Sequence, residues 1–251
     1  MTHLAFTLTD QNTLVQQGRC AQCAVKALCL PVGLTAAQWA LFGHVVGPRL
    51  KVLRGEALFH AGEPMGSLYA VRMGSFKTTL VSQDGRAQVT GFWMAGDVIG
   101  LDAISGNRHL CTALAIEDSD VCPLSFSQVE RLGREVPSLQ HHLNCLLSRE
   151  IGKEHHLRLS MGSLGADARL AAFLLDLSRR QVERGYSAHG FILRMSREDI
   201  ASYLGLRLET VCRSIARLRQ AGLVRCRGRV IDLLDLHALE ISVTGDRHDA
   251  A

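Results

Sequence analysis

The sequence lacks any apolar run long enough to span a bilayer, which requires about 20 consecutive residues. Its first ten residues also lack the basic start, apolar core and small-residue cleavage site of a signal peptide, since Asp10 follows only a few apolar residues. Low-complexity segments and internal repeats are missing as well. We therefore expect a cytoplasmic protein without a membrane partner, in which thiols stay reduced.

The motifs of common enzyme classes are also absent. The sequence has no phosphate-cradling glycine loop, no nucleophile elbow and no histidines at metalloprotease spacing. His141–His142 and His155–His156 are adjacent pairs, whose members cannot both face one site on a helix. We expect that the protein is not an enzyme, with an iron–sulfur reductase as the alternative of another class.

The composition is that of a globular protein, with 47% hydrophobic and 21% charged residues among 251. This length allows two domains with their own cores. The net charge of +4 is unevenly distributed. Glu209 is the single acid in a basic stretch that contains Arg207, Arg213, Arg217, Arg219, Arg225, Arg227 and Arg229. Such a stretch indicates binding to phosphate, and a solvated helix face is the alternative.

Three cysteines lie within ten residues, Cys20, Cys23 and Cys29, in a C-x2-C-x5-C pattern. Soft thiolates at this spacing are typical of a soft metal or an iron–sulfur cluster, and a reducing compartment disfavours disulfides. Such a site needs a fourth ligand from another part of the chain. The candidates are Cys111, Cys122, Cys145, Cys212 and Cys226.

The pattern changes from strands to helices along the chain. Short period-two runs separated by glycine turns, between about residues 50 and 124, predict a compact antiparallel sheet or roll. Helical spacing then predicts a helix from near Ser138 to Met161, about 36 Å long. Its apolar seam, Leu143, Leu147 and Ile151, indicates a partner helix and hence a homodimer, with a domain-spanning core helix as the alternative.

A second pattern, near the C-terminus, predicts a winged helix-turn-helix. Ser196 caps a short helix, Gly205 forms a tight turn, and an arginine-rich helix follows. Two β-like runs around Gly228 form the wing. On the second helix, the residues expected to point outward toward base edges or the DNA backbone are Glu209, Cys212, Arg213 and Arg217.

This order of elements, together with the residues from Ser196 to Arg213, resembles the cyclic-AMP receptor/fumarate–nitrate regulator superfamily. Within it the chain is similar to the oxygen-sensing fumarate–nitrate regulator (FNR) branch over nearly its whole length. The resemblance implies an α+β fold class. Its domains would be a cluster-binding segment 1–30, a β-roll sensor domain 31–135, a dimerisation helix 136–162 and a winged helix-turn-helix domain 163–251.

The resemblance also implies a [4Fe–4S] cluster. The family pattern matches Cys20, Cys23 and Cys29, with Cys122 as the fourth ligand and Cys111 as the fallback. Leu28 matches a position that shields the cluster from oxygen, and a plain packing role is compatible with this. Zinc or heme at these cysteines is an alternative, because four thiolates also suit tetrahedral zinc.

For DNA, the resemblance implies a palindromic TTGAT-like operator. Cys212 stands where the family usually has serine, which places the outermost base preference in question. Glu154 stands on the helix seam where the branch usually has aspartate, with Arg158 one turn on. The loop 82–86 is the implied contact for RNA polymerase. A cyclic nucleotide is a further alternative, although the segment 107–112 lacks the Arg-Ser pair of nucleotide-binding siblings.

Overall fold

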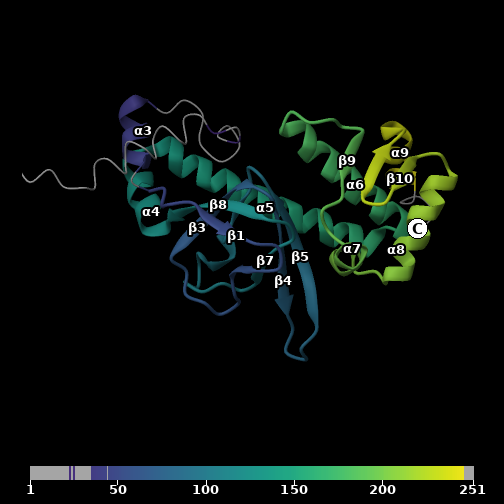
Figure 1. The fold of residues 1–251 in the computed structure, drawn as a ribbon, viewed down its shortest axis with the longest axis horizontal. Coiled ribbons are helices and arrows are strands. Elements are labelled where there is room, and N and C mark those ends of the chain that lie inside the picture. Colours follow the sequence, from purple (N-terminus) through teal and green to yellow (C-terminus); the bar gives the residue numbers. More distant parts are fainter. Residues whose placement is uncertain (1–22, 24, 26–34, 44, 246–251) are drawn as a thin grey trace, which may run out of the picture. The chain divides into compact units, whose positions relative to one another are not determined.

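The computed structural model describes residues 23, 25, 35–43 and 45–245 of the chain (Figure 1). The chain divides into two compact units. The first contains Met1–Leu80 and Phe92–Ser148, and the second contains Val81–Gly91 and Arg149–Ala251. Within the described residues, no helix combines the length and the apolar character that crossing a membrane requires.

The predicted β-roll is present, and its described part consists of two four-stranded sheets. One sheet has the order β1-β8-β3-β6, with strands Leu50–Val52, Ser119–Ser125, Ser67–Met73 and Val98–Ile99. The other has the order β2-β7-β4-β5, with strands Ala57–Phe59, Thr112–Ala115, Ser75–Val81 and Ala87–Met94. Alternate residues of both sheets form one buried core, which includes Val71, Phe76 and Val121. The period-two pattern in the sequence therefore reports this shared apolar interior.

Gly74 makes the tight turn between β3 and β4. Its φ is +91°, in the left-handed region, and a Cβ at this position would overlap Ser119 Oγ. The turn thus requires glycine both for backbone conformation and for space.

Helices cover a second core on the roll. They are α3 (Ala36–Gly43), α4 (Phe126–Glu135) and the first part of α5 (Pro137–Ser163). Phe42, Leu68, Leu132 and Leu139 are buried together in this core. Helix α5 was expected to run from near Ser138 to Met161, and it runs from Pro137 to Ser163. Gly162 does not end the helix, because one glycine lowers helix propensity without removing a backbone hydrogen bond.

The predicted winged helix-turn-helix is confirmed as a set of elements. Its helices are α6 (Ala166–Glu183), α7 (Arg197–Leu204), α8 (Leu208–Gln220) and α9 (Leu236–Gly245). The wing strands are β10 (Val224–Arg227) and β11 (Val230–Leu233). Strand β9 (Gly190–Ile192) pairs with β11 and was not predicted, because three residues are too few to show a periodic pattern.

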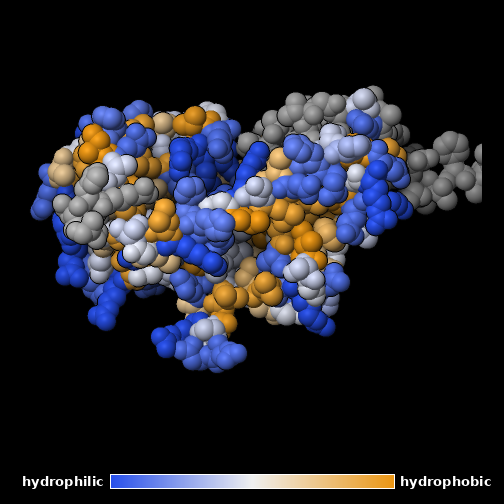
Figure 2. Space-filling view, turned by 180° about the vertical axis from the view of Figure 1, so that it is seen from behind, coloured by the Kyte–Doolittle hydropathy of each residue, from blue (hydrophilic) through white to orange (hydrophobic). Residues whose placement is uncertain are grey.

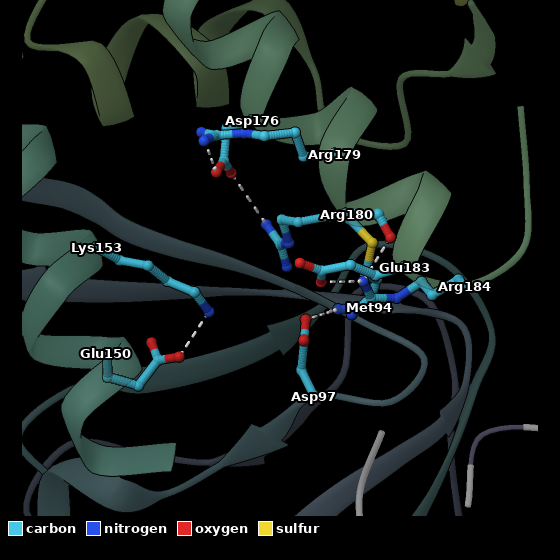
Figure 3. A network of polar contacts seen from close by, with 9 residues as sticks. All are labelled: Met94, Asp97, Glu150, Lys153, Asp176, Arg179, Arg180, Glu183 and Arg184. Atoms are coloured by element: carbon cyan, nitrogen blue, oxygen red, sulfur yellow. Dashed lines mark hydrogen bonds and ion pairs between the residues drawn. The ribbon is translucent and has the colours of Figure 1, made fainter. Parts of the chain in front are cut away.

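Charged pairs line α5 and α6 within the second unit (Figure 3). Asp176 lies 3.4 Å from Arg179 and 3.9 Å from Arg180, and Lys153 lies 2.6 Å from Glu150. Tyr203 of α7 is near these groups: burial, followed by the charge of Asp176, raises its pKa to about 12. Glu154 and Glu150 of α5 contribute in the same direction.

Candidate nucleic-acid interface and candidate metal centre

Helix α8 presents a polar outer face opposite a buried one. Val211, Ile215 and Leu218 are buried, which fixes the rotation of the helix against its neighbours. Glu209 and Arg213 are exposed, and Cys212 between them is half-buried. The first turns of α8 therefore offer an acceptor and a bidentate donor to solvent, which is the chemistry needed to distinguish base edges.

Arg197 joins this face from the neighbouring helix α7, and the sequence reasoning did not single it out. Its Nη1 lies 3.6 Å from Cys212 Sγ. It also acts on Cys226 of the wing: burial raises the pKa of that thiol, whereas Arg197 and Arg219 pull the pKa down. The one feature of the sequence that could have pointed to Arg197 is its position directly after the N-cap Ser196, at the start of the helix-turn-helix.

Arg217, expected to lie near the DNA backbone, makes an ion pair in the structure. Its Nη1 donates to Asp167 Oδ2 in the first turn of α6 at 2.7 Å. The side chains remain 56% and 35% exposed, so the pair contributes at most about 1 kcal/mol. A phosphate could therefore replace Asp167 as the partner of Arg217 at small cost.

Two of the four predicted cluster ligands lie within the described residues. Cys20, Cys29 and Leu28, the residue expected to shield a cluster, fall outside them. Cys23 and Cys122 are both half-buried, the latter on β8. Burial raises the pKa of the Cys122 thiol, Arg49 and Arg72 oppose this, and Cys23 raises the pKa further. Cys23 and Cys122 therefore lie close enough to interact electrostatically.

Cys111, the fallback ligand, has a different environment. It is 8% exposed, and its Sγ donates to Asp102 Oδ2 at 3.3 Å. Burial and the adjacent Asp102 carboxylate raise its pKa to about 12. This thiol stays protonated at neutral pH, which disfavours metal ligation. Across the described part of the chain, no three His, Cys, Asp or Glu side chains converge to hold a metal ion.

The predicted dimer seam divides into two parts along α5. Leu143 is buried in the chain's own core, and Leu147 packs partly against that core. Further along, Ile151 is 57% exposed, and Glu154 and Arg158 are also exposed. In the isolated chain, only this second part of the seam is therefore exposed and able to contact a partner helix.

The hairpin between β4 and β5 carries the loop 82–86. Asp84 accepts hydrogen bonds from Ser82 and from Arg86, and these bonds lower the pKa of its carboxyl group. Leu80 and Val81, just before the loop, are exposed. Figure 2 shows the tip of the hairpin as a hydrophilic lobe next to an apolar neck.

Comparison with known proteins identifies the family to which the chain belongs. Residues 168–241 match the model of the Crp-like helix-turn-helix domain, and residues 49–135 match that of the cyclic nucleotide-binding domain. The chain is 41% identical over 221 residues to the transcriptional regulatory protein btr of Bordetella pertussis, covering 88% of this chain and 91% of that protein. It is 35% identical over 229 residues to the fumarate and nitrate reduction regulatory protein of Escherichia coli K12, covering 90% and 92%. The chain is an FNR-type member of the CRP/FNR family.

A solved structure agrees with this family membership. The structure of FixK2 from Bradyrhizobium japonicum has a TM-score of 0.71 and 31% sequence identity, and covers 78% of this chain and 96% of that chain. The expected α+β fold with a β-roll and a winged helix-turn-helix is therefore confirmed. The relatives are transcription regulators, so this FNR-type chain is a regulator that binds DNA through its helix-turn-helix and is not an enzyme.

Proposed function

We propose that this FNR-type regulator senses oxygen through a [4Fe–4S] cluster, dimerises along α5 when the cluster is present, and binds a palindromic TTGAT-like operator. In this role it activates or represses genes of anaerobic metabolism. The C-x2-C-x5-C pattern in a chain 35% identical to the fumarate and nitrate reduction regulatory protein carries the proposal. The contribution of Cys23 to the raised pKa of Cys122 supports a site shared with the β-roll. The proposed ligands are Cys20, Cys23, Cys29 and Cys122.

Two arginines lie near Cys122, the proposed fourth ligand. Burial raises the pKa of its thiol, and the positive charges of Arg49 and Arg72 partly offset this, so the thiolate form that binds iron is disfavoured less than burial alone would make it. When bound, an iron–sulfur cluster supplies a redox-active link among its cysteines. The chain's own part is to bring thiolates from two segments together and to shield them, with Leu28 beside Cys29 as the proposed shield.

Cysteine replacements test this assignment. Cys122→Ser should abolish anaerobic retention of iron and acid-labile sulfide, because a cluster that loses one thiolate is weakly held. Cys111→Ser is the matched control, since this thiol already bonds to Asp102 and should leave the cluster intact. The measurement is an iron and sulfide assay after purification without air, followed by operator binding before and after exposure to air. Loss of the cluster in Cys111→Ser but not in Cys122→Ser would contradict the assignment, and metal without sulfide would favour zinc.

The dimer and DNA parts of the proposal are supported by exposed groups. Ile151 and Leu159 are 57% and 51% exposed and eight residues apart on α5, so they share one face that a second copy could cover. A dimer would place two α8 helices about one DNA turn apart, as a palindrome requires. RNA polymerase contact at the loop 82–86 completes the proposal, and the hydrophilic tip of the hairpin suits a polar docking partner.

The cyclic-nucleotide alternative is disfavoured by Asp102. Its Oδ2 accepts the backbone N–H of Leu110 at 2.8 Å and that of Cys111 at 3.3 Å. A carboxylate thus already occupies backbone donors in the segment where a nucleotide phosphate would need them. A second negative charge at this point would be repelled.

A further inference from the structure

Arg169 links the ends of three helices in the second unit. It lies in the first turn of α6, and its guanidinium donates to backbone carbonyls of the other two helix ends. Nη2 donates to Met161 O at 2.8 Å in the last turn of α5, and Nε donates to Leu164 O at 2.9 Å, directly after that helix. Nη1 lies 3.4 Å from Leu204 O, at the end of α7. Carbonyls at helix C-termini lack helical partners and carry partial negative charge, so a guanidinium there is doubly favourable.

A second contact joins the same two helix ends. Gly205, the C-cap of α7, has a φ of +63°, and a Cβ on it would lie 3.5 Å from Met161 Cε. The side chain of Met161 therefore lies against the turn between α7 and α8. The effect of Glu150 and Glu154 on Tyr203 also places α7 beside α5.

We propose that Arg169 is a positioning residue that fixes the helix-turn-helix to the end of α5 and thereby sets the operator spacing that the dimer accepts. The inference rests on the proposed function, because spacing is defined only for a dimer on a palindrome. Arg169 touches no DNA in this role. It determines whether α8 follows α5 as one rigid body, and α5 in turn is held to its partner in the dimer.

The physical consequence is selectivity for half-site separation. One added base pair moves a half-site by about 3.4 Å along the DNA axis. It also rotates the half-site by about 35°, since a turn contains 10 to 10.5 base pairs. A rigidly fixed pair of recognition helices cannot follow this change, whereas a loosely held pair can.

The test uses the full-length protein with its cluster, kept without air. Fluorescence anisotropy measures affinity for the palindromic operator and for operators with one base pair inserted or removed at the centre. The spacing ratio is the affinity for the palindromic operator divided by the affinity for an operator of changed spacing. For Arg169→Gln we expect this ratio to fall about tenfold, or about 1.4 kcal/mol, relative to the unmodified protein. Arg169→Lys should give an intermediate ratio, because an ammonium keeps the charge but not the planar fork.

A second arginine of α6 provides the matched control. Arg179→Gln removes the same charge from the same helix, where the side chain is 76% exposed, and should leave the ratio unchanged. A variant that is merely less stable would lose affinity for all operators equally. An unchanged ratio in Arg169→Gln overturns the proposal, and if that variant fails to fold, an unchanged ratio in Arg169→Lys does so. If the unmodified protein binds no palindrome, the proposed function fails first.

Discussion

Arginines at two exposed positions illustrate how one residue type can serve two purposes. Arg213 lies on the outer face of α8 beside Cys212, and Arg225 lies on the wing strand β10. A helix in the major groove brings its side chains to base edges, whereas a wing lies along the backbone. The same guanidinium is therefore expected to specify sequence at one position and to add affinity at the other.

Arg213→Ala should lose about 1–3 kcal/mol of discrimination at one guanine, because a bidentate contact to O6 and N7 is removed. The measurement is affinity for the operator and for single-base variants at fixed salt. Arg225→Ala is the matched control and should weaken binding to all sequences alike, with a salt slope smaller by about 1. Equal losses on operator and random DNA for Arg213→Ala would count against this docking.

Among the elements, α7 has a start that its own sequence encodes. Ser196 Oγ accepts the N–H of Asp199 at 3.0 Å, and Asp199 Oδ2 accepts the N–H of Ser196 at 3.0 Å. This reciprocal cap satisfies two donors that the first turn leaves without helical partners.

Ser196→Ala should lower the free energy of unfolding of the second unit by about 1 kcal/mol, since one capping acceptor is lost. Urea unfolding followed by circular dichroism measures the change. Arg179→Ala is the control: this 76% exposed arginine lies inside α6 of the same unit, where alanine is the better helix former, so no comparable loss is expected. A cap that contributes nothing would give equal midpoints for the two variants.

At the scale of the whole molecule, α5 belongs to both units, because the boundary between them falls after Ser148. Its first part is buried in the chain's own core, and its second part carries the exposed Ile151 and Glu154. In a dimer, two Glu154 carboxylates would approach each other in a partly desolvated seam and oppose association.

Glu154→Ala should therefore yield a dimer that binds the operator in air and without iron, because the restraint on the cluster-free protein is removed. Sedimentation velocity and operator binding of the aerobic variant are the measurements. Glu130→Ala, which removes an exposed carboxylate from α4, should remain monomeric. A monomeric Glu154→Ala without operator affinity would refute the restraint and leave the cluster proposal intact.

The sequence by itself determined the strand-rich β-roll, the capped helix α7 and the arginine-rich helix after it, because each depends on residues close together in the chain. Period-two runs, the Ser196–Asp199 box and Gly205 report local conformation directly. Only the tertiary structure placed Arg169 on the carbonyls of α5 and α7, paired Arg217 with Asp167, and brought Cys23 near Cys122. These contacts join residues of different elements, and whether such side chains meet depends on how helices and strands pack, which no local pattern encodes.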